Sequence, residues 1–313
     1  ICYIQKPPTP TILIKVMADV KPTFMLSVPL VIEKIYRNRV LPNFQKNIFI
    51  KELYAIPFIR KMLNRIAGKK LVETFGGNLR FFGIGGAGLS PAVEKFLREA
   101  HFPYCVGYGL TETAPLLAGT NPGRTKYKAI GPALPGTELE LRDQNEEGTG
   151  TLWARGPNVM MGYYKDPEKT AEVMDEEGWF NTEDIGYFDN EGYFFMHGRV
   201  KNIIVGSSGE NIYPEQIESM LNLHPYVADS LVFDNEGVLS ARIHLDYEKL
   251  DELFGVKQKS ETKTHAKIDE LLEEIRAEVN TKVSAFSRIK KIIEQREPFE
   301  KTPTKKIKRY LYV

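Results

Sequence analysis

One continuous stretch of the chain, from Gly178 to Glu218, constrains its fold more than any other. This stretch contains an acid that follows a turn, Asp184, then a predicted hairpin, an Arg-x-Lys pair formed by Arg199 and Lys201, and a Ser-Ser-Gly-Glu-Asn loop. The pattern before the stretch predicts one kind of structure and the pattern after it predicts another. We therefore interpret it as a boundary that carries chemistry.

The composition is that of a soluble globular protein and excludes several classes of function. A chain of 313 residues is expected to form two or three domains. Forty-two basic residues against 41 acidic ones leave a net charge of +1, so no overall field recruits nucleic acid or a membrane. Two cysteines and no apolar run of about 20 residues predict a cytoplasmic protein without a transmembrane segment.

Periodicity predicts an α/β part followed by an α+β part. Residues 1–125 alternate between strand and helix patterns, which predicts a partial αβ subdomain with parallel strands. Residues 126–200 contain short alternating strands and turn signals, which predict a small antiparallel, barrel-like subdomain. Residues 201–313 predict a compact α+β domain with a polar loop over 257–264, an amphipathic helix over 266–282 and a basic, solvated tail.

Two glycine-containing loops follow predicted strands in the αβ part. The first is Gly85-Gly86-Ala87, which precedes a helix with Ser90 as its expected N-cap, and the second is Tyr108-Gly109-Leu110-Thr111-Glu112. The ends of such strands are where open α/β sheets bind ligands, and a carboxylate there suits Mg²⁺. Taken singly, the first loop is equally well explained as an ordinary tight turn, and the second is better explained as a loop capped by Thr111 with a solvated Glu112.

Several motifs in their expected order resemble the adenylate-forming superfamily, most closely its long-chain fatty acyl-CoA synthetases. The loop that begins at Tyr108 resembles the family's YGxTE, GWFNTEDIG over 178–186 resembles GWFxTGD, and Gly198 to Lys201 resembles GRxK. The loop 209–214 and the terminal KTPTKKIKR over 301–309 match the motifs that follow. The resemblance covers essentially the whole chain and implies a fatty acid, ATP and coenzyme A as substrates, with AMP as product and Mg²⁺ as metal.

The resemblance also implies roles for individual residues. Glu112 would hold Mg²⁺, Thr111 a phosphate oxygen, and Asp184 the ribose hydroxyls, with Arg199 in the ribose or phosphate region. The adenine would lie by Tyr108-Gly109 and the backbone of Gly85, Gly86 and Ala87. Lys201 would be the hinge about which a mobile C-terminal domain rotates, so that either Lys306 or the loop 207–213 with Gly209 and Glu210 faces the nucleotide. An exposed strand lysine is the plainer alternative for Lys201.

Two positions depart from the family pattern. Glu183 stands where the family has the glycine of TGD, and it adds a negative charge beside Asp184. Lys305 stands where the family has a glycine, so Lys305 and Lys306 are both candidates for the adenylation lysine. The sequence alone offers no role for Glu183.

The family's phosphate loop, of the form TSGTTGxPK, does not occur in the 313 residues. We therefore interpret the chain as the C-terminal portion of a synthetase, inactive by itself, and we expect it to self-associate through apolar surface and strand edges. Peripheral association with a membrane is compatible with a fatty acid substrate. The alternatives are an acyl-AMP ligase or amino-acid adenylation domain that serves a carrier protein, and a non-catalytic module that binds nucleotides or acyl groups.

Overall fold

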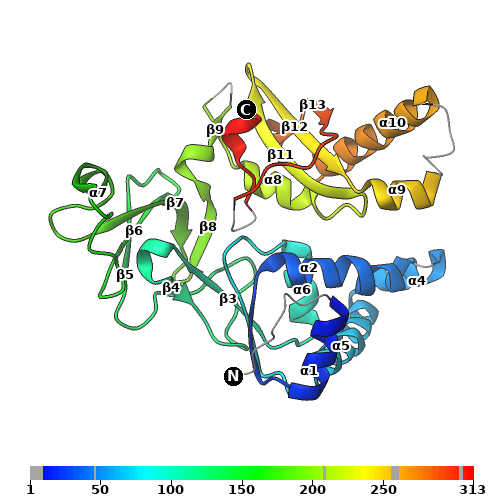
Figure 1. Cartoon of the computed structure of the whole chain (residues 1–313), viewed down its shortest axis with the longest axis horizontal. Helices are drawn as coiled ribbons and strands as arrows, with labels where there is room; N and C mark the ends of the chain where they lie inside the picture. The colour runs from blue at the N-terminus through cyan, green and yellow to red at the C-terminus, as the bar shows by residue number, and fades with distance from the viewer. Residues whose placement is uncertain (1–9, 46, 207–208, 255–260, 303–305) are drawn as a thin grey trace. The chain divides into compact units, whose positions relative to one another are not determined.

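A computed structural model describes residues 10–45, 47–206, 209–254, 261–302 and 306–313. The chain divides into two compact units, one formed by residues 1–182 and 186–196 and the other by residues 183–185 and 197–313 (Figure 1). The short piece 183–185 therefore belongs to the second unit although its neighbours on both sides belong to the first.

The first unit begins with helices around a four-stranded sheet (Figure 1). The strand order is β1-β2-β3-β4, in which β1, β2 and β3 are parallel and β4 is antiparallel to β3. The elements in chain order are α1 (Pro10–Val20), β1 (Phe24–Ser27), α2 (Pro29–Ile35), the π-helix η1 (Tyr36–Val40), α3 (Leu41–Gln45), α4 (Ile48–Ala55), α5 (Pro57–Thr74), β2 (Phe81–Ile84), α6 (Pro91–Glu99), β3 (Tyr104–Gly109), the 3-10 helix η2 (Thr111–Thr113) and β4 (Leu116–Gly119).

The buried strand β2 explains why this region folds as a layered α/β structure. Phe82 and Ile84 are almost fully buried, and the ring of Phe82 packs against Phe75 and Phe102 from the flanking segments. Apolar residues on both faces of a parallel strand require helices on both sides of the sheet. The predicted αβ subdomain with parallel strands is confirmed for β1 to β3.

The antiparallel region forms an open sheet in the order β5-β6-β7-β8. Its elements are β5 (Glu138–Arg142), β6 (Gly150–Arg155), α7 (Pro167–Val173), β7 (Phe180–Phe188) and β8 (Phe194–Arg199). Leu152, Ala154 and Phe194 are fully buried in a cluster that also contains Tyr108 and Leu117. No sheet in the described part of the chain closes on itself, so the form expected to be barrel-like is an open sheet.

The second unit is built around the sheet β11-β12-β13. Strands β11 and β12 form an antiparallel hairpin whose two-residue tip, Glu236-Gly237, has positive φ angles of 54° and 82°, and β13 pairs with β12 in parallel. The elements are η3 (Val200–Asn202), β9 (Ile204–Val205), β10 (Asn211–Ile212), α8 (Pro214–Leu221), β11 (Val227–Asn235), β12 (Val238–Leu245), α9 (Tyr247–Phe254), α10 (Glu261–Asn280), η5 (Ala285–Ser287), β13 (Lys291–Glu294) and η6 (Arg309–Leu311).

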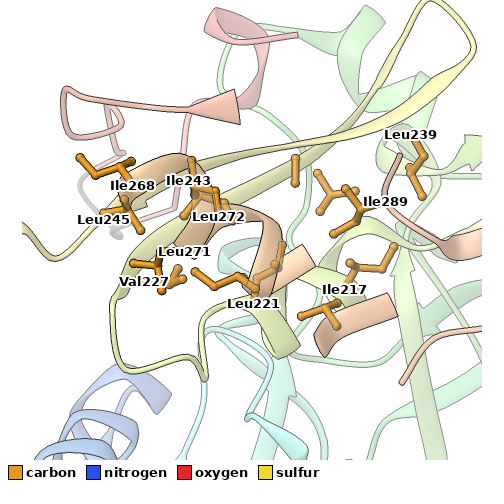
Figure 2. Close-up of a cluster of buried hydrophobic side chains, with 14 of the residues drawn as sticks. Ile217, Leu221, Val227, Leu239, Ile243, Leu245, Ile268, Leu271, Leu272 and Ile289 are labelled. Atoms are coloured by element: carbon orange, nitrogen blue, oxygen red, sulfur yellow. The ribbon is translucent and has the colours of Figure 1, made fainter. Parts of the chain in front are cut away.

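One apolar cluster holds the second unit together. Leu271, Ile275 and Val279 recur every four residues along α10 and are all buried, as the sequence period predicts. Figure 2 shows Leu271 and Leu272 of α10 among Leu221 of α8 and Ile243 of β12. The helix begins at Glu261, so the prediction of a loop over 257–264 is wrong for residues 261–264, and residues 255–260 lie outside the described part.

Among the described residues, no helix combines the length and the apolar character that crossing a bilayer requires.

Candidate functional site

The loop after β2 lies directly against the neighbouring strand β3. A Cβ atom on Gly85 would lie 3.2 Å from the carbonyl oxygen of Gly107, and the amide of Gly85 donates to the carbonyl of Ser27 on β1 at 3.1 Å. Gly86 has a φ of +86°, a left-handed conformation that favours glycine. The glycines therefore allow a tight turn at the carboxyl ends of three adjacent strands.

Ser90 is the residue before α6, as predicted, but its side chain does not cap the helix. Its own amide donates to Oε1 of Glu33 at 2.8 Å, so a carboxylate from α2 satisfies the amide of the residue before the helix. Burial raises the pKa of Glu33, and the hydrogen bond from Ser90 opposes that rise. The sequence separation of 57 residues made this contact invisible to a local capping rule.

The loop after β3 needs a glycine for steric reasons. A Cβ atom on Gly109 would lie 1.6 Å from the carbonyl oxygen of Pro115, so any side chain at this position would clash with the backbone. The preceding residue, Tyr108, is buried and its ring packs 5.9 Å from that of Phe194, centroid to centroid. Its role beside an adenine ring stays a prediction.

The two polar residues of this loop lie in the 3-10 helix η2. Thr111 is exposed and Glu112 is half-buried. Oε1 of Glu112 accepts a hydrogen bond from the hydroxyl of Tyr163 at 3.1 Å, and the backbone carbonyl of Glu112 accepts from the amide of Met160 at 2.7 Å. The segment 160–163 therefore fixes both ends of Glu112, while its second carboxylate oxygen receives no hydrogen bond from Tyr163.

Tyr163 contacts a candidate site residue, a contact that the sequence analysis missed. The run Gly162-Tyr163-Tyr164 is explained most simply as aromatic core, and this interpretation is wrong for Tyr164, which is 88% exposed. Tyr163 is half-buried and reaches Glu112 across 51 residues of sequence. Only the repeated aromatic residues beside a glycine hinted at a special position.

In the second unit, Asp184 is the most deeply buried of the predicted site residues, with 1% of its side chain exposed. Nε of Arg199 donates to Oδ1 of Asp184 at 2.9 Å, and the guanidinium remains 40% exposed. A buried carboxylate requires such a partner, because an unpaired charge inside a protein is strongly unfavourable. The pair presents a positive group to solvent with an acid fixed behind it.

Glu183 occupies an unusual backbone conformation and has a specific partner. Its φ of +57° lies in the left-handed region, where glycine is the favoured residue. Its carboxylate forms an ion pair with Nζ of Lys201 at 2.8 Å. Lys201 lies in the 3-10 helix η3 rather than in a strand, and 71% of its side chain is exposed.

The loop that contains Gly209 and Glu210 is described only in part, since residues 207–208 lie outside the described residues. Gly209 has a φ of +88°, and the amide of Gly206 donates to the carbonyl of Glu210 at 2.8 Å. The loop is thus closed at its base, just before the short strand β10.

Lys306 lies at the end of a small antiparallel bridge. The amide of Thr302 donates to the carbonyl of Lys306 at 2.8 Å, and Lys301 pairs with Ile307. Lys306 is exposed as a residue, yet partial desolvation of its ammonium is the largest cause that lowers its pKa. The charge of Arg199 lowers this pKa further and that of Asp184 opposes the change. Lys305 lies outside the described residues.

The terminal segment is held by ion pairs, whereas its composition indicates a solvated tail. Nη1 of Arg309 lies 2.7 Å from Oε1 of Glu218 on α8, and Arg309 also donates to the carbonyl of Val232 on β11. Desolvation raises the pKa of Glu218 to about 6, against the opposing charge of Arg309. Nζ of Lys301 pairs with Asp229 at 2.7 Å.

The predicted residues therefore gather in two places. In the first unit, the loop 85–87 lies against β3, whose end carries Thr111 and Glu112. In the second unit, Asp184, Arg199 and Lys306 lie within electrostatic reach of one another.

Comparison with known families shows which family the chain belongs to. Residues 1–164 match the family model described as AMP-binding enzyme, and residues 201–312 match the one described as AMP-binding enzyme C-terminal domain. The chain belongs to the AMP-binding enzyme family. The expected superfamily is thereby confirmed.

Curated relatives of this AMP-binding enzyme include fatty acid–CoA ligases. Long-chain-fatty-acid–CoA ligase FadD15 of Mycobacterium bovis is 30% identical over 95% of this chain and 54% of its own length. Fatty acyl-CoA synthetase A of Dictyostelium discoideum is 32% identical over 79% of this chain and 41% of its own length. The chain thus spans about half the length of the curated relatives it matches.

Solved structures share the fold. O-succinylbenzoate coenzyme A synthetase of Bacillus subtilis in complex with AMP superposes with a TM-score of 0.66 at 22% identity, over 95% of this chain and 53% of that one. The predicted α/β plus α+β class is confirmed by this likeness.

Proposed function

We propose that this chain is the C-terminal portion of an ATP- and Mg²⁺-dependent long-chain fatty acid–CoA ligase. In the first half-reaction a fatty carboxylate attacks the α-phosphorus of ATP, which gives acyl-AMP and releases pyrophosphate. In the second, the thiol of coenzyme A attacks the acyl carbonyl and AMP leaves, which gives the thioester. The similarity to curated fatty acid–CoA ligases supports the substrate class.

The observation that carries the proposal is the group formed by Asp184, Arg199 and Lys306. A buried carboxylate behind a half-exposed guanidinium suits the two ribose hydroxyls, which can donate to Asp184 when nucleotide is bound. Lys306 would place its ammonium against the carboxylate and the α-phosphate, where negative charge develops. Gly85, Gly86, Ala87, Tyr108 and Gly109 would bind the adenine.

Glu112 and Thr111 would serve the phosphates. Mg²⁺ is commonly held by one or two carboxylates together with substrate phosphates. Glu112 fits this pattern because the hydroxyl of Tyr163 orients its carboxylate through Oε1, while Oε2 would be the oxygen that binds the metal. When bound, Mg²⁺ neutralises charge on the phosphate oxygens. Glu112 would be held in place by Tyr163, and the exposed hydroxyl of Thr111 would donate to a phosphate oxygen.

The division of the chain is part of the proposal. Residues 1–125 and 126–200 would belong to the large AMP-binding domain, and residues 201–313 to a mobile domain. Lys201 would be its hinge. In the alternative orientation Gly209 and Glu210, in place of Lys306, would face the nucleotide, and coenzyme A would be bound.

The decisive experiment separates the half-reactions in the full-length protein. We expect pyrophosphate release only in the presence of a fatty acid, and we expect Lys306→Ala to abolish it while sparing thioester formation from preformed acyl-AMP. Lys305→Ala is the matched control. Loss of adenylation in the Lys305 variant alone would transfer the role to that residue.

Two further measurements separate the alternatives. A carrier-protein thiol that accepts the acyl group where coenzyme A does not would identify a carrier-dependent ligase or adenylation domain. Calorimetry with AMP and ATP on the 313-residue chain tests its own binding. Similar weak affinity for AMP and ATP fits a chain without the phosphate loop. A strong preference for ATP would contradict the proposal that this chain lacks the groups that bind the β- and γ-phosphates.

A further inference from the structure

The helix α5 has an outer face that combines apolar and basic side chains. Phe58, Met62 and Ile66 are 79%, 48% and 53% exposed, and they follow one another at intervals of four residues. At 100° per residue these three positions fall within one stripe along the helix. Three large apolar side chains aligned in solvent are an exposed patch that calls for a partner.

The same face carries a net positive charge. By their helical angles, Lys61 and Arg65 lie on one side of the apolar stripe and Lys70 on the other, while Lys69 lies between Phe58 and Met62, all exposed. The whole of α5 contains five basic residues and one acidic residue, Glu73, which is exposed on this face between the angles of Met62 and Ile66. Among the described residues, no carboxylate lies within ion-pair distance of Lys61, Lys69 or Lys70.

The opposite face of α5 packs against the rest of the first unit, so the apolar side chains of the outer face are not the ones that hold the helix in place. Asn64 is 1% exposed, donates to Glu99 of α6 at 2.7 Å and accepts from the hydroxyl of Tyr54 at 2.9 Å. Arg60 forms a two-pronged contact with the same Glu99. A Cβ atom on Gly68 would collide with Ala100, so α5 packs closely beside the end of α6. These contacts fix the rotation of the helix.

The preceding helix α4 also exposes apolar side chains. Ile48 and Phe49, at the start of α4, are 78% and 69% exposed, and the helix begins at a side-chain cap, where Asn47 accepts from the amide of Ile50 at 2.8 Å. Figure 1 shows α4 and α5, which follow one another along the chain, within the first unit.

We propose that the α5 outer face, meaning Phe58, Met62 and Ile66 with Lys61, Arg65, Lys69 and Lys70, docks on the surface of an anionic lipid bilayer. The excess of basic side chains on this face favours an anionic surface as the partner. A helix face that combines large apolar side chains with an excess of lysine and arginine suits the bilayer interface, with apolar side chains at the acyl boundary and cations that extend to the headgroups. Among the described residues no helix can span a bilayer, which fits docking on its surface.

This docking goes beyond the proposed catalytic function and does not depend on it. A ligase whose substrate is a long-chain fatty acid would gain local access to its substrate at such a surface. Vesicle binding without nucleotides tests docking alone, so its failure leaves the half-reaction experiments unaffected.

The test is flotation of the 313-residue chain with vesicles of phosphatidylcholine alone and with vesicles that also contain phosphatidylglycerol. We expect binding to the anionic vesicles only, with affinity that falls as salt is added. Lys61→Glu with Lys69→Glu should weaken binding by about tenfold or more. Lys290→Glu with Lys291→Glu, two exposed lysines of the second unit, is the matched charge control.

A second pair of variants tests the apolar stripe. Phe58→Ser with Met62→Ser should abolish flotation, whereas Val238→Ser with Phe286→Ser, which are 39% and 48% exposed, should leave it unchanged. All four positions are exposed, and circular dichroism checks that each variant is folded. Absence of binding to anionic vesicles, or equal binding by the stripe variant, overturns the proposal. If the stripe variant instead abolishes self-association in light scattering and leaves flotation unchanged, the occupant is a second copy of the chain.

Discussion

The backbone at Glu183 offers the sharpest test of the structure. With a φ of +57°, this residue adopts a conformation that costs a non-glycine residue about 1 to 2 kcal/mol. Its ion pair with Lys201, whose side chain is 71% exposed, returns about 0.2 to 1 kcal/mol. The ion pair therefore offsets only part of the strain, and a single substitution cannot separate the two contributions.

A pair of substitutions separates them. Glu183→Ala removes the ion pair and keeps the strain, whereas Glu183→Gly removes both. Glycine loses about 0.5 to 1 kcal/mol through the greater freedom of the unfolded chain. We therefore expect the glycine variant to be more stable than the alanine variant by about 0.5 to 1 kcal/mol, and Lys201→Ala to cost as much as the ion pair contributes.

Differential scanning calorimetry measures this order directly. The expected difference in Tm between the glycine and alanine variants is about 1 to 3 °C in a chain of this length. Glu183→Asn should fall between them, because asparagine tolerates the left-handed region better than alanine. An alanine variant as stable as the glycine variant would show that Glu183 is not strained, and relief of backbone strain would then not account for the family's glycine at this position.

Three more predictions rest on single contacts. Because the pKa of Glu218 is raised from 4.5 to about 6, the folded state binds its proton more tightly than the unfolded state. The free energy of unfolding should fall by about 2 kcal/mol in total as the pH rises through both values, most steeply between them, and Glu218→Gln should remove this slope in urea titrations. Gly109→Ala should cost at least about 2 kcal/mol in thermal unfolding, because its Cβ meets a backbone carbonyl, whereas Gly88→Ala, with nothing within 4 Å, should cost far less. Arg199→Gln should raise the pKa of Lys306, measured by NMR titration of its ammonium, because it removes a nearby positive charge. An unchanged pKa would show that Arg199 does not lie close enough to Lys306 to affect its charge.

Much of the fold follows from periodicity and motif order. The strand and helix alternation in the first part and the amphipathic period of the helix that contains Leu271, Ile275 and Val279 are local or repetitive signals, and the structure agrees with them. The ends of elements were less predictable, since α10 begins at Glu261, inside a polar stretch.

The contacts that position the candidate site residues could not be predicted from the sequence. The sequence shows Glu183 as an extra charge near Asp184, whereas the structure shows a backbone conformation and a lysine partner. The contact from Tyr163 to Glu112 and the one from Glu33 to Ser90 each join segments more than 50 residues apart. No local rule of propensity or capping can pair such residues.

The anchoring of the terminal segment has a consequence for biosynthesis. Arg309 and Glu218 are 91 residues apart, and Lys301 and Asp229 are 72 apart, so these ion pairs close very long loops. Ribosomes add about 5 to 20 residues per second, so Glu218 leaves the ribosome several seconds before its partner exists. During that interval the carboxylate stays hydrated at the surface of an unfinished unit, and its burial awaits the emergence of Arg309.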